Sequence, residues 1–251
     1  MSPAETAIQP LTFGSIGRWI ALGWQCLSKS PAVSLFYASL YVILGMAFQW
    51  GLHATGYTLL HYLFAGGFLL LLPPLLVVYY QIIDNQTEGK KVSMATLGQA
   101  FRNTPKTVFG LAVITGILYF IWITDALIIY TVYFALDPIH FGSYAQDLQL
   151  RLDTQEFLFH VSLLGLLLAL IAFFITAFAV PKAFYEKSSF VDAIVYSIKT
   201  IIHNFKVMIL WAAIVGGVQL FALLFFPPLE LVLLPLFAYA NYYAFQDTLT
   251  A

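Results

Sequence analysis

Long apolar stretches alternate with short polar segments along the whole chain. A helix rises about 1.5 Å per residue, so about 20 apolar residues cross the roughly 30 Å hydrocarbon core of a bilayer. Six stretches of this kind are present, at residues 33–52, 57–80, 107–136, 157–180, 207–226 and 229–245. The pattern therefore predicts an all-α fold, a polytopic bundle of six transmembrane helices, with residues 1–251 as a single integral membrane domain.

The composition is incompatible with an ordinary water-facing surface. Hydrophobic residues make up 61% of the chain and charged residues 9%, against roughly 45–50% and about 25% in soluble domains. The net charge of -1 offers no basic surface for nucleic acid. Cys26 is the single cysteine, which excludes an intramolecular disulfide and any CxxC motif. We expect membrane lipids as partners, other inner-membrane proteins as further candidates, and no nucleic acid and no cofactor.

Positive charges are distributed very unevenly among the loops. The third loop, residues 137–156, contains a single basic residue, Arg151. The other ten basic residues lie before the first span or in the second and fourth loops, which share one side of the predicted bundle: Arg18, Lys29, Lys90, Lys91, Arg102, Lys106, Lys182, Lys187, Lys199 and Lys206. Cytoplasmic loops carry an excess of Lys and Arg. This distribution predicts a bacterial inner-membrane protein with both termini in the cytoplasm.

Three polar segments on that side have the periodicity of amphipathic helices, at residues 16–30, 92–104 and 190–204. In the third, Ser189 followed by Asp192 is typical of a helix start. In the first, one face is apolar: Ile16, Trp19, Ile20, Gly23 and Leu27. The chain is thus interpreted as three units, each an interfacial helix followed by a helical hairpin. The other interpretation stays open, since any loop that leads into lipid tends to be amphipathic.

Small residues recur at a spacing of four inside the spans. The pairs are Ala112 with Gly116, Gly165 with Ala169, Ala212 with Gly216, and Ala213 with Gly217. Such pairs let neighbouring helices approach closely, so helix packing is their expected use, and a dimer face is the other possibility. Pro73, Pro74 and Pro235 lie within spans, where we expect them to bend the helices.

Ionisable side chains within the spans are the candidates for chemistry, because their desolvation is costly. Asp125 lies in the third span, about nineteen residues from its cytoplasmic entry, which is near the outer interface at ~1.5 Å per residue. The polar candidates in or near the membrane are Asp125, His61, His160 and Glu230, with His53 and His140 on the same outer half. No HxxxH or HExxH pair is present, so we expect no metal site and no catalytic residue.

Several short motifs resemble a known group of proteins. They are Gly23-Trp24, Lys29-Ser30-Pro31, the run from Ala179 to Ala183, the run from His203 to Lys206, and Tyr242-Tyr243 before Gln246-Asp247. The chain resembles uncharacterised proteobacterial six-span inner-membrane proteins, a family with no assigned activity. Its layout is distantly similar to the membrane domains attached to some glycerophosphodiester phosphodiesterases. The resemblance implies a membrane location and transfers no catalytic residue.

Three hypotheses of function follow from these patterns. The favoured one is a non-enzymatic scaffold, assembly or envelope-organising component of the membrane, because amphipathic helices are present and site chemistry is missing from the sequence. The second is a small transporter or channel that uses the polar groups around Asp125. The third is a membrane-embedded enzyme that acts on lipid.

Overall fold

The computed structural model describes residues 8–55, 70–134 and 148–249, and within these ranges every regular element is a helix. The all-α prediction is confirmed for this part of the chain. Four described segments are long and apolar enough to cross a membrane: Pro31–Ala54, Lys106–Phe134, Leu152–Glu186 and Phe205–Phe225. The predicted span at 57–80 falls mostly outside the described residues, and the last predicted span corresponds to α12 (Glu230–Gln246), which has 17 residues.

The long helices closely match the spans predicted from the sequence. They are α2 (Pro31–Ala54), α6 (Lys106–Phe134), α8 (Leu148–Thr176) and α11 (Phe205–Phe225). One boundary was predicted wrongly, because α8 begins nine residues before position 157 and includes the end of the predicted third loop. Asp153 and Glu156 suggested a loop there, but good helix formers such as Leu and Gln surround them and continue the helix.

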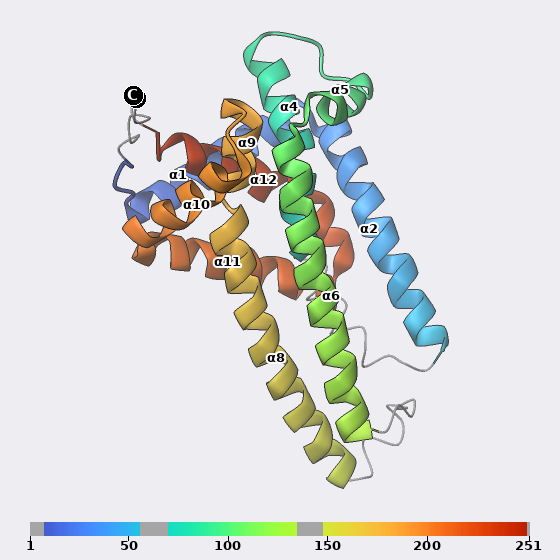
Figure 1. The fold of residues 1–251 in the computed structure, drawn as a ribbon. Coiled ribbons are helices and arrows are strands. Elements are labelled where there is room, and N and C mark those ends of the chain that lie inside the picture. The colour runs from blue at the N-terminus through green and yellow to red at the C-terminus, as the bar shows by residue number, and fades with distance from the viewer. Residues whose placement is uncertain (1–7, 56–69, 135–147, 250–251) are drawn as a thin grey trace.

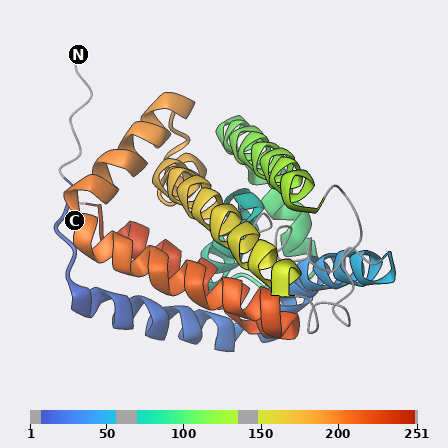
Figure 2. The same cartoon turned by 90° about the horizontal axis from the view of Figure 1, so that it is seen from below.

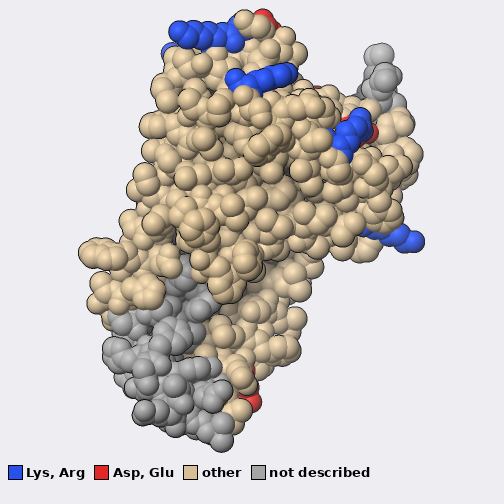
Figure 3. All heavy atoms as spheres, turned by 180° about the vertical axis from the view of Figure 1, so that it is seen from behind, with Lys and Arg blue, Asp and Glu red and all other residues tan. Residues whose placement is uncertain are grey.

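The three helices α2, α6 and α8 project in one direction from a body made of the shorter helices (Figure 1). The body contains α1 (Phe13–Lys29), α4 (Val77–Thr87), α5 (Ala95–Asn103), α9 (Ala179–Glu186), α10 (Phe190–His203) and α12. Helix α11 lies across the direction of α6 and α8 in Figure 1, and in the view from below it lies between α1 and α8 (Figure 2). On the face shown in Figure 3, Lys and Arg side chains appear only over the body and none lies on the projecting lower part.

Each of the three predicted amphipathic segments forms a helix that runs almost directly into a long apolar one. Ser30 alone separates α1 from α2, and Asn204 alone separates α10 from α11. Pro31 occupies the first turn of α2, where its missing N–H costs nothing. The predicted helix start is also confirmed, since the backbone N–H of Asp192 donates to the Ser189 Oγ at 3.2 Å.

Helices α1 and α12 make the most extensive contact between described elements. The face predicted for α1 is the buried one, with Trp19 fully buried and Ile16 nearly so. At Gly23 the helices are so close that an added Cβ would lie 2.8 Å from the Leu236 carbonyl oxygen and 3.0 Å from the Ala240 nitrogen. Glycine is required here because the backbone of α12 occupies the space of a side chain.

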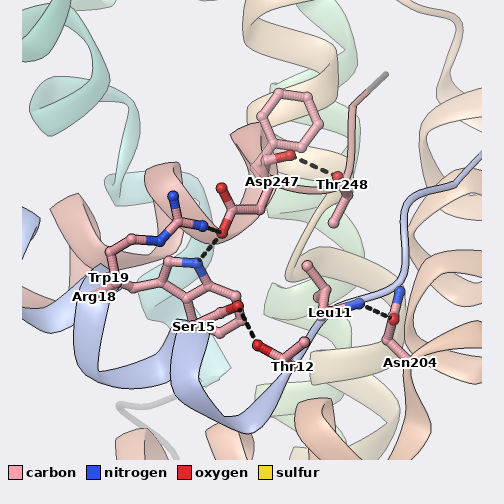
Figure 4. Close-up of polar contacts among 9 residues, drawn as sticks. Leu11, Thr12, Ser15, Arg18, Trp19, Asn204, Asp247 and Thr248 are labelled. Atoms are coloured by element: carbon pink, nitrogen blue, oxygen red, sulfur yellow. Dashed lines mark hydrogen bonds and ion pairs between the residues drawn. The ribbon is translucent and has the colours of Figure 1, made fainter. Parts of the chain in front are cut away.

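Polar contacts close the same interface near the ends of the two helices (Figure 4). The carboxylate of Asp247, just after α12, accepts a hydrogen bond from the Trp19 indole N–H at 2.6 Å and pairs with Arg18. The Trp19 ring also meets Trp211 of α11 edge to face, with centroids 5.5 Å apart. Because the indole is buried, its N–H needs a hydrogen-bond acceptor within the protein, and the Asp247 carboxylate supplies it.

The segment before α1 is held against two other parts of the body. The Leu11 N–H donates to the Asn204 side-chain oxygen at 2.7 Å (Figure 4), and the Asn204 amide donates to the Gln9 carbonyl at 3.2 Å. The Gln9 N–H donates to the Thr248 carbonyl at 3.3 Å. Asn204 therefore turns the chain between α10 and α11 and at the same time fixes the N-terminal segment.

The close contact at Gly23 generates a mutational prediction. We expect Gly23→Ala to destabilise the protein by about 1–3 kcal/mol, because the new methyl group meets backbone atoms that cannot move aside. The matched control is Gly17→Ala in the same helix, where an added Cβ meets nothing within 4 Å. The control should be neutral or stabilising, since alanine favours helix. Thermal unfolding of both variants in detergent measures the difference, and equal stability would contradict the packing described.

Candidate functional site

A cavity of about 690 Å³ lies between α8, α11, α12 and the segment around residue 70. Residues 70–75 are helical and the helix is interrupted at Leu76, two residues after Pro74. Leu72, Pro73 and Leu76 contribute to the wall at this interruption. Its volume falls within the range of roughly 300–1,000 Å³ that is typical of ligand pockets.

Small residues on α11 create much of this space. The pairs Ala212 with Gly216 and Ala213 with Gly217 all line the cavity, and an added Cβ at either glycine would meet nothing within 4 Å. For these two pairs the expected helix packing is not found within the described residues, because none of them lies close to a Cβ added at either glycine. The prediction holds at Gly165 of α8, where a Cβ would lie 2.5 Å from the Trp122 ring of α6.

Few polar side chains line the cavity, and two of them come from α11 and α12. Asn241 of α12 donates from its amide to the Ala177 carbonyl at 2.9 Å and to the Tyr80 hydroxyl at 3.3 Å. Gln219 of α11 is 5% exposed. The hydroxyl of Thr176 donates to the Ala172 carbonyl of its own helix at 2.6 Å. Gln219 thus presents a buried polar group in the lining that makes no hydrogen bond to the backbone of the described residues.

Glu230 lies beside Gln219 and is fully buried in the first turn of α12. Neither of its carboxylate oxygens has a well-aligned hydrogen-bond partner among the described residues, although the Gln219 side chain is close enough to stabilise the carboxylate weakly. The hydroxyls of Tyr41 and Tyr79 are close enough to interact with it electrostatically. The helix N-terminus favours a negative charge, but a buried carboxylate without a well-aligned partner still costs several kcal/mol. Glu230 is therefore retained at a position that is unfavourable for stability.

The four polar candidates from the sequence do not form one site in the described part of the chain. Asp125 is half-buried on α6 and does not line the cavity. His160 is exposed on α8, where its Nδ1 lies 2.8 Å from the Glu156 carbonyl oxygen and 3.2 Å from the Tyr133 hydroxyl. His61 lies outside the described residues. Of the three candidates within the described residues, Glu230 alone is near the cavity.

Within the described residues, no three His, Cys, Asp or Glu side chains are grouped so that they could hold a metal ion. Sequence reasoning missed Gln219 and Asn241, although a signal was present for both. Gln219 is the single amide in the apolar run 207–226, and Asn241 interrupts an aromatic run near the end of the chain. Because only ionisable side chains were considered as candidates, these two neutral amides were missed.

A second buried polar cluster is structural. The amide of Asn103 donates to the Gln81 side-chain oxygen at 2.7 Å, and the Gln81 amide donates to Asn85 at 3.2 Å. Asn85 in turn donates to Thr96 and Gln99 at 3.2 and 3.1 Å. These hydrogen bonds join α4 to α5, and the polar groups satisfy one another. None of these residues lines the cavity described above.

Asp84, on the same helix α4, is partly buried near this network. Burial raises the pKa of its carboxyl above the usual range, and a hydrogen bond from the Tyr185 side chain counteracts the rise. A raised pKa in a carboxyl means that its ionisation opposes folding. Asp84 does not line the cavity, so we assign it no role in the site.

Comparisons with known proteins agree with the apolar character of these helices. Residues 61–184 match the model of a family described as predicted integral membrane protein (DUF2189), which covers just under half of the chain. No curated protein and no solved structure matches. The chain is an integral membrane protein. Its apolar helices make it multi-pass, and the description of the similar family names no activity.

Burial of Glu230 generates a prediction about stability. We expect Glu230→Gln to stabilise the protein by about 1–3 kcal/mol, because it removes a group that is ionisable, buried and without a well-aligned hydrogen-bond partner. The gain should increase at alkaline pH, where a carboxylate replaces the less costly carboxylic acid. Thermal unfolding across a pH series measures it. The control is Glu156→Gln on the exposed face of α8, which should change little, and a loss of stability in Glu230→Gln would contradict the argument.

Proposed function

We propose that the chain is a non-enzymatic component of a bacterial inner membrane that organises lipids or other envelope proteins around it. In this proposal six helices span the bilayer, both termini lie in the cytoplasm, and residues 1–251 act as one domain. The amphipathic helices α1, α5 and α10 then rest at the inner leaflet.

The observation that carries the proposal is the surface of the body. Helix α10 buries one face among its neighbours and exposes Val191, Val195 and Ile202 on the other, with Lys199 beside them. An exposed apolar stripe flanked by cationic side chains suits the boundary between acyl chains and anionic headgroups. The same combination in a water-facing helix would leave large apolar groups in contact with solvent.

Helix α1 repeats this arrangement. Phe13 and Trp24 are exposed although the opposite face is packed on α12, and Arg18 and Lys29 lie on the exposed side. Each of these short helices leads directly into a long apolar helix, as the three-unit interpretation requires. A shared position at one leaflet would account for both features and for the concentration of Lys and Arg on the body (Figure 3).

A transporter or channel is not favoured by the arrangement around Asp125. A polar pathway needs several polar side chains that face one another across the bundle. Asp125 lies on α6 away from the cavity lining, and the cavity itself is mostly apolar. The comparisons add no transport or catalytic description.

Cysteine labelling tests the proposed topology. In a Cys26→Ser background, one cysteine is placed at Thr55, which is exposed after α2, and another in a second variant at Lys91, which is exposed between α4 and α5. A membrane-impermeant maleimide should label Thr55→Cys in cells with a permeabilised outer membrane and Lys91→Cys only after lysis, because the positive loop stays in the cytoplasm. Labelling of Lys91→Cys in unlysed cells would overturn the orientation.

Photo-crosslinking tests the proposed role at the leaflet. A benzophenone amino acid at Val195, on the exposed apolar stripe of α10, should give adducts with lipid or with other membrane proteins in native membranes. The matched position is Lys90, an exposed site in the polar segment before α5, which should give few. Mass spectrometry of the adducts identifies the partner. Equal yields at the two positions would contradict a membrane-facing stripe.

A further inference from the structure

We propose that the cavity between α8, α11 and α12 takes up an acyl chain of a membrane phospholipid. This goes beyond the proposed function and does not depend on the direction in which the termini face. It concerns a binding site inside the protein, whereas the function above concerns its outer surface.

The cavity is chemically suited to hydrocarbon. No Lys, Arg, Asp or Glu is among the described residues that line it, so no counter-charge is available for a phosphate or an amine. Its walls are formed mainly by Leu, Ala, Gly, Val, Phe and Trp side chains. Apolar cavities stay free of water and bind apolar ligands instead. The lipid headgroup would therefore remain outside while a chain enters.

The surroundings of the cavity supply this ligand. The outer faces of the helices that form it carry large exposed apolar side chains, among them Leu167 on α8 and Phe221 and Phe225 on α11. In an integral membrane protein such faces contact lipid tails, so the medium next to the opening is itself made of acyl chains. Leu166 and Leu220 belong both to this exposed surface and to the cavity lining, which makes the two continuous.

Gln219 provides a polar contact that fits a phospholipid. The side chain is 5% exposed, lines the cavity, and lies beside the buried Glu230. One N–H of its amide is directed to the Glu230 carboxyl. The second N–H can donate to the ester carbonyl that joins an acyl chain to glycerol, which is a neutral acceptor. A neutral amide at this position favours an ester over a charged group.

Two buried tryptophans in the lining allow lipid entry to be measured by the quenching of their fluorescence. Trp122 and Trp211 line the cavity and are 3% and 1% exposed, whereas Trp24 and Trp50 lie on the surface. Replacing Trp24 and Trp50 with Phe leaves Trp19, Trp122 and Trp211, which are all buried. Bromine quenches indole fluorescence only at close range, so a brominated chain must enter the protein to act on these residues.

The experiment compares this parent in bilayers of phosphatidylcholine with dibrominated acyl chains and in the same lipid without bromine. We expect strong quenching in the parent and a severalfold smaller effect in Gly216→Leu, whose new side chain projects into the cavity. The matched control is Gly116→Leu on α6, where a Cβ also meets nothing within 4 Å but the residue is not part of the lining. It should retain the quenching of the parent.

Either of two results would overturn the proposal: no quenching in the parent, or equal quenching in Gly216→Leu and Gly116→Leu. Size-exclusion elution in detergent verifies that each variant is folded. If Gly216→Leu is not recovered, Gly217→Leu takes its place, because its Cβ also faces open space and it lines the same cavity.

Discussion

The contact between α1 and α12 determines how the rest of the body is arranged. At Gly23 two backbones approach so closely that no side chain fits between them, and this brings Trp19 against Trp211 of α11. The core around these rings also includes Phe178, before α9, and Tyr196 of α10. Segments from both ends of the chain therefore meet in one apolar cluster. Because α12 is held in this cluster, its first turn, with Glu230, is fixed beside α11.

Much of the fold could be predicted from the sequence because lipid imposes a simple length rule. The boundaries of α2, α6 and α11 differ from the predicted spans by only a few residues. The buried face of α1 was also predictable, because its apolar residues recur with the period of an α-helix. The start of α8 was not predictable in this way, because charged residues were used to recognise loops, whereas Asp153 and Glu156 lie within the helix.

The site was harder to predict because it depends on space between helices that are distant in sequence. Gly216 and Gly217 have the same local sequence pattern whether they face a neighbouring helix or open space, and only the arrangement of the other helices decides between these outcomes. Glu230 could be selected because a carboxylate near lipid is rare. Gln219 has no charge and was passed over, although it is the residue of the pair that reaches the cavity.

The bond between Trp19 and Asp247 joins residues that are 228 positions apart. During synthesis α1 is therefore made well before α12. Until α12 has been made, the face of α1 around Gly23 lacks the helix that covers it in the structure. This contact can therefore form only after α12 has been synthesised, however early α1 folds.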